Sequence, residues 1–287
     1  MTRSFANERV FITGGSSGIG RAMACQLASE GAHVCIVARG QAAIDDTVAQ
    51  MQTLAAAPTQ QLFGLALDIG KREDIFALVD PALERLGGLD VLINNAGITH
   101  PASFVDTPDE MFDSIMRVNF FGTVHVTRAL LPALIESRGQ IGIVSSLAGV
   151  IGIYGYTAYG ASKFALRGFA ESLRHDLMQH GIDVTVAFPP DTDTPQLQQE
   201  NLIKPPETHA LAGKVVALSA EFVARETLEG LRRRRVYVKP GFGTKLVIFA
   251  AQRFPGITRW FLDNDLRRFQ RRQLAALASG DPAKRGD

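Results

Sequence analysis

The stretch Thr13-Gly14-Gly15-Ser16-Ser17-Gly18-Ile19-Gly20 follows a short apolar run at residues 10–12 and opens a helical pattern at residues 19–29. Glycine lets backbone N–H groups come close to a pyrophosphate, and the helix behind the turn points its positive N-terminus at the same group. In isolation such a segment would indicate only a glycine-rich turn. Between a first strand and a first helix, the spacing G-x-x-x-G-x-G predicts a dinucleotide site formed by Gly14, Ser16, Ser17, Gly18, Ile19 and Gly20.

Apolar runs of strand length alternate with segments of helical period over the first 190 residues. The runs cover residues 10–12, 34–37, 62–67, 91–93, 141–144 and 184–187, and helical patterns lie near residues 19–29, 42–56 and 158–180. Strands that are apolar throughout are buried on both faces, which is typical of a parallel sheet covered by helices on each side. The sequence therefore predicts an α/β fold, a doubly wound parallel sheet of the Rossmann type, with a C-terminal helical extension.

The length and composition are those of an ordinary globular chain. Its 287 residues allow one large domain or two small ones, at roughly 150 residues per domain. Apolar residues make up 46% and charged residues 21%, which argues against disorder and coiled coil. After residue 190 the periodicity weakens. We expect residues 1–195 to form the dinucleotide-binding and catalytic core, and residues 196–287 to add a substrate-side segment and a basic C-terminal extension to the same single domain.

Charge and cysteine content exclude several other classes of protein. The formal net charge of +1 supplies no global field for nucleic acid, so we expect no nucleic-acid partner. Cys25 and Cys35 cannot form a disulfide framework, and no His and Cys cluster has the spacing of a zinc site, so we expect a reducing compartment and no metal. The first residues lack the pattern of a signal peptide, which favours a cytoplasmic protein. The uncharged stretch 139–162 is broken by Gly, Ser and Tyr, and we interpret it as a buried strand, a loop and a helix start rather than a membrane helix.

Three further residues stand at the ends of predicted strands, where the carboxyl edge of a parallel sheet meets its ligand. Arg39 follows the second strand, where an enzyme that uses NAD would place an acidic residue for the ribose hydroxyls. A guanidinium suits a 2′-phosphate, so the sequence predicts NADP(H) as the cofactor, and the alternative is an exposed loop arginine. Asp68 and Asn95, after the third and fourth strands, are expected to line the same crevice, although either could serve only its turn.

Tyr159 and Lys163 lie four residues apart in a predicted helix, so both side chains fall on one helix face. A free tyrosine has a pKa of about 10, and a nearby cation can lower such a pKa by about one to three units, which allows proton exchange near neutral pH. The pair alone is a weak signal, because any helix can contain it by chance. Ser146, at the end of a predicted strand, and Asn119, in an earlier apolar segment, strengthen it. We choose Ser146 over Ser145 because Ser145 should point to the other side of the strand.

Together these motifs resemble the short-chain dehydrogenase/reductase family over residues 8 to about 195. The matching features, in order, are the glycine motif, Asn94-Asn95-Ala96-Gly97, Asn119, Ser146 and the Tyr159/Lys163 pair. The resemblance implies that Tyr159 is the general acid, that Lys163 lowers its pKa and binds the nicotinamide ribose, and that Ser146 polarises the carbonyl. It also implies that Asn119 holds a water in the proton relay.

The turn after the sixth predicted strand departs from the family pattern. The family usually has Pro-Gly there, whereas this chain has Pro189-Pro190, and Pro190 offers no backbone donor. The resemblance implies that Thr192 and Thr194, which follow in the same turn, contact the cofactor.

The departing segment is similar to one branch of the family. Phe188-Pro-Pro-Asp-Thr-Asp-Thr-Pro, followed by Glu200-Asn201 and Lys204-Pro205, is similar to reductases of 3-ketosphinganine. This implies an enzyme that uses NADPH to reduce the 3-keto group of a long-chain amino ketone, giving sphinganine. The alternatives are reduction of a steroid or a 3-oxoacyl chain, and a non-catalytic NADP(H)-binding regulator. We expect the alkyl chain of this keto-lipid substrate in a slot lined by Leu197, Leu202, Ile203, Phe188 and Tyr154, although ordinary core or lid packing explains these residues equally well.

The C-terminal segment is basic. From residue 225 to residue 287, fifteen Lys and Arg stand against six Asp and Glu, a net charge of +9. The apolar run 246–251 is far shorter than the roughly twenty residues that span a bilayer. Trp260 and Phe261 among arginines indicate peripheral contact with an anionic membrane; the alternative is that both pack on the core or on a partner subunit. We also expect a homo-oligomer.

Overall fold

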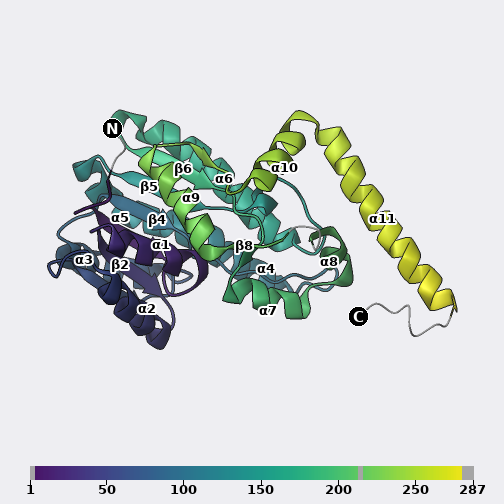
Figure 1. Ribbon diagram of the computed structural model, residues 1–287, viewed down its shortest axis with the longest axis horizontal. Helices are drawn as coiled ribbons and strands as arrows, with labels where there is room; N and C mark the ends of the chain where they lie inside the picture. Colours follow the sequence, from purple (N-terminus) through teal and green to yellow (C-terminus); the bar gives the residue numbers. More distant parts are fainter. Residues whose placement is uncertain (1–3, 213–215, 280–287) are drawn as a thin grey trace.

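The computed structural model describes residues 4–212 and 216–279. At its centre is a seven-stranded sheet in the order β3-β2-β1-β4-β5-β6-β9, and every neighbouring pair is parallel (Figure 1). The strands are β1 Arg9–Thr13, β2 His33–Ala38, β3 Leu62–Ala66, β4 Val91–Asn94, β5 Gln140–Val144, β6 Asp183–Ala187 and β9 Tyr237–Val238. The prediction of a doubly wound parallel sheet is confirmed, and the first six strands coincide with the six apolar runs.

Helices cover both faces of the sheet, which is why its strands are apolar throughout. Along β1, Phe11 packs into one core cluster, whereas Val10 and Ile12 pack into the other, because successive side chains of a strand point to opposite faces. One face is covered by α1 Gly18–Ser29, α2 Gln41–Leu54 and α9 Ala220–Arg232, and the other by α3 Arg72–Leu86, α5 Thr123–Ser137 and α6 Thr157–Leu177.

A long helical run crosses the second face. It consists of α4 Asp109–Ile115, a π-helical segment Met116–Gly122 and α5, which continue into one another. By length and composition alone the run Asp109–Ser137 could cross a membrane. Its contacts with α3, β4 and α6 account for the apolar residues on its buried side. The stretch 139–162, in contrast, contains β5, the short 3₁₀ turn Leu147–Gly149 and the start of α6, as the sequence predicts.

Between residues 192 and 219 the chain forms a small unit outside the main sheet, and it then returns to that sheet. A small parallel pair, β7 Thr192–Asp193 and β8 Leu218–Ser219, is joined to α7 Pro195–Ile203 and α8 Pro206–Ala212. Helix α9 then packs on α1, and β9 pairs with β6 at the edge of the main sheet. The sequence gives no sign of β9, because two residues are too few to show a period of two.

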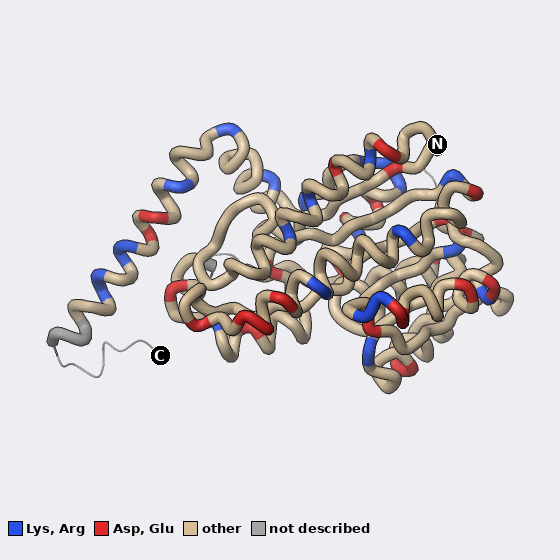
Figure 2. The backbone as a smooth tube through the Cα atoms, turned by 180° about the vertical axis from the view of Figure 1, so that it is seen from behind, with Lys and Arg blue, Asp and Glu red and all other residues tan. Residues whose placement is uncertain are grey.

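The described part of the chain finishes with two helices at the periphery of the fold. Helix α10 Phe242–Arg253 contributes Ile248 to a core cluster, whereas α11 Pro255–Ser279 contributes none of its described side chains. Figures 1 and 2 show α11 projecting from the body of the molecule, and it contacts α8 along the way. Trp260 and Phe261 are 60% and 56% exposed, so the alternative that they pack on the core is wrong. The predicted helical extension is confirmed.

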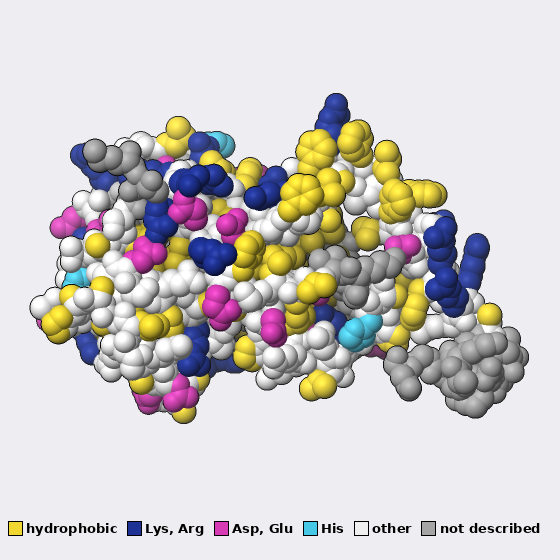
Figure 3. Space-filling model, viewed as in Figure 1, with side chains coloured by type: hydrophobic (Ala, Val, Ile, Leu, Met, Phe, Trp, Pro, Cys, Tyr) yellow, Lys and Arg dark blue, Asp and Glu magenta, His cyan; other side chains and the backbone are white. Residues whose placement is uncertain are grey.

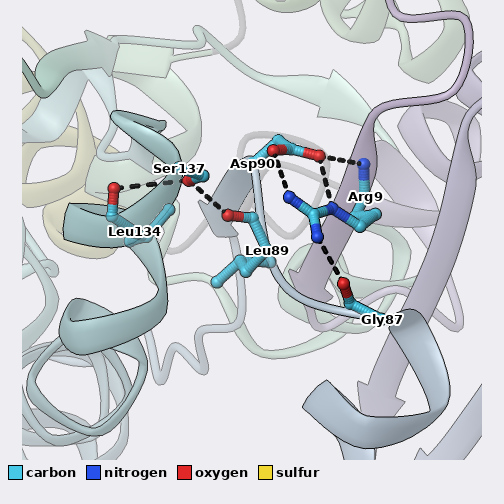
Figure 4. A network of polar contacts seen from close by, with 6 residues as sticks. All are labelled: Arg9, Gly87, Leu89, Asp90, Leu134 and Ser137. Carbon is cyan, nitrogen blue, oxygen red and sulfur yellow. Dashed lines mark hydrogen bonds and ion pairs between the residues drawn. The ribbon is translucent and has the colours of Figure 1, made fainter.

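The amino ends of β1 and β4 are joined by an ion pair between Arg9 and Asp90 (Figure 4). Arg9 donates from Nε to Oδ2 of Asp90 at 2.8 Å and from Nη2 to Oδ1 at 2.7 Å, and its backbone N–H donates to Oδ2 at 2.9 Å. The remaining Nη1 donates to the carbonyl of Gly87. Close by, the hydroxyl of Ser137 donates to the carbonyl of Leu89 at 2.6 Å. The side chains of Arg9, Asp90 and Ser137 therefore have hydrogen-bond partners here, whereas the buried side-chain amide of Gln140, at the amino end of β5, has none within the described residues.

Candidate active site

A cavity of about 710 Å³ lies at the opposite end of the sheet, where the carboxyl ends of the strands meet. Its lining includes almost all of the residues that the sequence predicts for the cofactor and the chemistry: Gly14, Ser16, Ser17, Gly18, Ile19, Arg39, Asp68, Asn95, Ser146, Tyr159, Lys163, Thr192 and Thr194. Gly20 and Asn119 do not line it. Residues that follow all of the strands β1 to β6, together with residues of α1 and α6, thus converge on one cavity, as the parallel topology requires.

The glycine turn is built for close approach. Gly14 and Gly18 have φ angles of +66° and +51°, which favour glycine, and a Cβ at Gly14 would lie 2.8 Å from Cα of Ala96. Asn95 holds the turn in place, because its Nδ2 donates to the carbonyls of Thr13 and Gly14 at 3.2 and 3.0 Å. Ser17 precedes α1 and its side chain makes no cap hydrogen bond, so the first N–H groups of the helix keep their capacity to bind an anion.

Gly20 serves the packing of the turn and does not line the cavity. A Cβ at this position would lie 2.1 Å from the carbonyl oxygen of Gly14. The absence of a side chain therefore lets α1 press against the turn, which is an indirect contribution to the predicted cofactor site.

Arg39 lies at the rim of the cavity, directly after β2, and is exposed. Within the described part of the chain it forms no ion pair, so its guanidinium keeps its donors for a ligand. Asp68 lines the cavity after β3, and its Oδ1 accepts a hydrogen bond from the N–H of Gly70 at 2.9 Å. Asp68 therefore does both things that the sequence analysis considers for it: it lines the cavity, and it stabilises its own turn.

Tyr159, Ser146 and Lys163 meet at the cavity. The Tyr159 hydroxyl is hydrogen bonded to the Ser146 side chain. Nζ of Lys163 lies 5.5 Å from the centre of the Tyr159 ring and donates to the carbonyl of Val144 at 3.0 Å. Ser145 also borders the cavity, but its hydroxyl donates to the backbone carbonyl of Lys163 at 2.9 Å. Ser146, whose hydroxyl contacts the tyrosine, is therefore the serine available to a substrate.

The electrostatics of the pair differ from the expectation that Lys163 lowers the pKa of Tyr159. Burial raises the pKa of the Tyr159 hydroxyl, the negative charge of Glu200 raises it further, and the hydrogen bond with Ser146 acts in the opposite direction. Burial also lowers the pKa of Lys163 from 10.5 to about 8. In this structure burial and the negative charge of Glu200 outweigh the hydrogen bond with Ser146, and the pKa of Tyr159 is raised. Tyr159 is consequently protonated at neutral pH, the state that a proton donor needs.

Asn119 lies behind the cavity, in the π-helical segment, and is fully buried. Its Oδ1 accepts from the N–H of Ile98 at 2.8 Å, and its Nδ2 donates to the carbonyl of Ile98 and to the Ser162 hydroxyl, each at 2.9 Å. The side chain thus ties the loop after β4 to α6 next to the reacting pair. The role of Asn119 in a water relay stays a prediction.

The turn after β6 holds Thr192 and Thr194 at the cavity. Thr192 donates to the carbonyl of Pro190 at 2.9 Å, and the Thr194 hydroxyl caps α7 by accepting from the N–H of Leu197 at 3.2 Å. Cγ2 of Thr194 lies 2.9 Å from where a Cβ on Gly18 would stand, so this turn touches the glycine turn across the cavity. Pro190 itself is part of the lining.

The predicted alkyl slot is only partly present. Leu197 lines the cavity, but Leu202 and Ile203 are 85% and 51% exposed on the outer side of α7, and Phe188 is buried in the core. Tyr154 does not line the cavity either. The prediction for Leu202 and Ile203 is wrong because residues 197–203 form a helix. Side chains five or six positions apart on a helix point in different directions, so these two cannot face the cavity together with Leu197.

Tyr156 and Glu200 also line the cavity, and the sequence analysis assigns neither of them a role. Tyr156 donates a hydrogen bond of 2.6 Å to Oε2 of Glu200, and its ring lies 5.6 Å from that of Tyr159. Glu200 stands in a motif that the sequence analysis singles out, but nothing in the sequence shows that α7 folds back over Tyr159.

The fold and this site define the class of the protein. Residues 8–204 match the family model described as short chain dehydrogenase, so the chain belongs to the short-chain dehydrogenase/reductase family and is an oxidoreductase.

Among individual proteins, the chain is 39% identical over 218 residues to the 3-dehydrosphinganine reductase of Danio rerio, which covers 75% of this chain and 66%, slightly less than two thirds, of that protein. It is 33% identical over 269 residues to the 3-ketodihydrosphingosine reductase of Dictyostelium discoideum, covering 88% of this chain and 80% of that one. A short chain dehydrogenase from Burkholderia cenocepacia J2315, solved in complex with NADP, is 28% identical, with a TM-score of 0.71 over 82% of this chain and 95% of that one.

Proposed function

We propose that this chain uses NADPH to reduce the 3-keto group of 3-ketosphinganine, giving sphinganine for sphingolipid synthesis. The observation that carries the reaction class is the contact of Tyr159 with Ser146 and Lys163 in a cavity whose lining also holds the glycine turn and Arg39. The choice of substrate is supported by relatives that are named as reductases of this ketone.

The residues present fit NADP(H). A Cβ at Gly14 or Gly18 would collide with Ala96 or Thr194, so only glycine allows the tightly packed turn that brings the start of α1 to the cavity wall. The N-terminus of α1 would hold the pyrophosphate, and Arg39, which forms no ion pair with any described residue, would hold a 2′-phosphate. When bound, the reduced nicotinamide supplies the hydride.

The residues of the chain itself supply the proton and hold the carbonyl. Ser146 donates a hydrogen bond to the ketone oxygen, which draws electron density from the carbonyl carbon. Tyr159, which is protonated because burial raises its pKa, donates its proton to the oxygen as negative charge develops there. Lys163 places a positive charge beside the tyrosinate that remains, and Asn119 fixes the loop and helix that carry the site.

The direct test is oxidation of NADPH with a panel of ketones. We expect turnover with 3-ketosphinganine and much lower kcat/KM with a steroid ketone and with a 3-oxoacyl thioester. Turnover of one of these instead would keep the reductase and replace the substrate. No oxidation of NADPH with any ketone would refute the enzymatic proposal and favour a cofactor-binding regulator.

We further propose that α10 and α11 contact an anionic membrane from which this insoluble substrate is drawn. Phe242, Leu246, Phe249, Trp260 and Phe261 are each more than half exposed. Figure 3 shows apolar side chains gathered over α10 and the start of α11, with Lys and Arg side chains further along. Apolar residues that dip into the interface while arginines meet anionic headgroups would account for both features.

Co-sedimentation with anionic vesicles tests this contact. We expect binding that falls in high salt and is lost when Trp260 and Phe261 are both replaced by Ala. Phe76→Ala, at an exposed Phe on α3, is the matched control and should bind like the parent. A parent that never pellets with vesicles would contradict the proposal. The cytoplasmic location and the homo-oligomer stay predictions, and light scattering in solution checks the second.

A further inference from the structure

Glu200 is a buried carboxylate in the wall of the active-site cavity. It is 9% exposed and lies on α7, the first helix after the turn that holds Thr192 and Thr194. Its Oε2 accepts the hydrogen bond from Tyr156 at 2.6 Å, and its Oε1 accepts one from Nε2 of Gln196 at 3.1 Å. A carboxylate can accept about four hydrogen bonds, so both oxygens retain capacity for a further donor.

The carboxylate also lies close to the reacting group. Tyr156, which binds Glu200, has its ring 5.6 Å from the ring of Tyr159, and all three residues line the same cavity. The negative charge of Glu200 is felt at the Tyr159 hydroxyl, whose pKa it raises. A substrate whose ketone oxygen meets Tyr159 therefore lies in a cavity whose wall also carries Tyr156 and Glu200.

The positive charge supplied by the protein here is incomplete. Nζ of Lys204, itself buried, lies 3.9 Å from Oε2 of Glu200 and 3.7 Å from Oδ2 of Asp191, which also lines the cavity. One ammonium thus stands between two carboxylates, at distances longer than a hydrogen bond to either. The Asp191 side chain is 40% exposed and can be solvated, whereas that of Glu200 is only 11% exposed. Because a buried carboxylate without full compensation is costly, the arrangement is best satisfied by a second cation that enters the cavity.

We propose that Glu200 binds the ammonium group of the substrate, on the carbon next to the ketone, and so selects 2-amino-3-keto lipids. The inference rests on the proposed function and adds its specificity-determining residue. An amino ketone carries its cation one carbon from the carbonyl that Tyr159 protonates, and Glu200 is a buried carboxylate in the wall of the same cavity. A neutral ketone would displace water from the carboxylate without replacing its hydrogen bonds, so it is disfavoured in the same site.

The test compares 3-ketosphinganine with 1-hydroxyoctadecan-3-one, which has the same chain and ketone but no amino group. We expect the parent to prefer the amino ketone in kcat/KM by about tenfold to a hundredfold, the range of a charge-assisted hydrogen bond. Glu200→Gln keeps the size of the side chain and an acceptor for Tyr156. We expect it to remove most of this preference by lowering kcat/KM for the amino ketone alone.

Glu207→Gln is the matched control, because Glu207 is a carboxylate on the next helix, α8, and does not line the cavity. It should leave kcat/KM for both ketones unchanged. Equal losses on both ketones in Glu200→Gln would show that Glu200 only supports the fold of α7, and would overturn the inference.

The parent enzyme alone separates the two proposals. If it reduces both ketones equally well, the inference is wrong and the reductase stands; if it reduces neither, the proposed function fails and the inference with it. Should Glu200→Gln not fold, inhibition of the parent gives a second measurement. Sphinganine should then inhibit at least about tenfold more strongly than octadecane-1,3-diol, and equal inhibition would overturn the inference.

Discussion

At the amino ends of β1 and β4, Arg9 and Asp90 bind each other with three hydrogen bonds, and Arg9 spends a further donor on the Gly87 carbonyl. At the carboxyl end of the sheet, Arg39 forms no ion pair within the described part of the chain, and the carboxylate of Glu200 shares the single ammonium of Lys204 with Asp191. The amino ends of β1 and β4 therefore carry an ion pair whose groups satisfy each other, and the carboxyl end of the sheet carries charged groups with unused hydrogen-bonding capacity. Charge at the first end stabilises the fold, and charge at the second is held for ligands.

This difference can be tested by substitutions at each end. A variant at the cavity should lose activity and keep stability, whereas a variant at Arg9 or Asp90 should do the reverse. The four predictions below run from the largest expected effect on activity to none.

Tyr159→Phe should have the largest effect. The variant keeps the ring and removes the proton donor, so kcat for ketone reduction should fall by a factor of about 10² to 10⁴. Titration of NADPH with parent and variant, followed by the change in NADPH fluorescence, should give the same Kd for both proteins. Retention of more than a tenth of the parent kcat would mean that another group supplies the proton.

Arg39→Ala should weaken NADPH by about tenfold to a hundredfold, because a charge-assisted hydrogen bond contributes about 1.5 to 3 kcal/mol. NADH lacks the 2′-phosphate, so its Kd should change little. Titration of both coenzymes against parent and variant measures the difference. A parent that uses NADH and NADPH equally would contradict the assignment of Arg39.

The buried Lys163 should impose a pH dependence of intermediate size. Its pKa is lowered from 10.5 to about 8, so it loses its charge in the folded protein as the pH rises through about 8. Because Tyr159 has a raised pKa and stays protonated in this range, kcat/KM for NADPH should fall about tenfold per pH unit above 8.

The free energy of unfolding should rise over the pH range in which kcat/KM falls, because both depend on the deprotonation of Lys163. Between pH 8 and 10.5 the unfolded chain keeps the Lys163 proton that the folded protein has released, so the free energy of unfolding should rise with pH over this window. Urea unfolding of parent and Lys163→Met at several pH values checks this, because the variant should lack the rise. A kcat/KM that is level from pH 7 to 9.5 would contradict the lowered pKa.

Asp90→Asn should leave activity unchanged. Arg9 and Asp90 are only partly exposed, with side-chain exposures of 30% and 18%, and loss of the carboxylate charge should lower the free energy of unfolding by about 1 to 2 kcal/mol. Urea unfolding measures the first effect and kcat/KM the second. A loss of activity in this variant without loss of stability would break the distinction between the two ends.

Much of the catalytic site is predictable because its residues are fixed by local geometry. The four-residue spacing of Tyr159 and Lys163 places both on one face of α6, and Ser146 follows directly from the end of β5. The glycine turn is equally local, since positive φ at Gly14 and Gly18 is a property of the backbone at those positions. These residues reach the cavity because strand ends of a parallel sheet share one edge.

The predictions that are wrong concern residues whose position depends on contacts with a distant part of the chain. Leu202 and Ile203 were expected in the cavity, but the orientation of α7 is set by the turn at Thr194 and by its contact with Tyr156, which no local pattern reveals. The two-residue strand β9 exists because it pairs with β6, not because of its own sequence.

The sequence by itself therefore determined the doubly wound sheet, the glycine turn and the order of Ser146, Tyr159 and Lys163, because strand and helix periods and turn conformations are local. Only the tertiary structure decided that burial sets the pKa of Tyr159, that Asn119 acts from behind the cavity, and that Glu200 stands beside the reacting group. Burial and charge depend on which segments meet in space, and residues 156 and 200 meet through packing across 44 positions of chain.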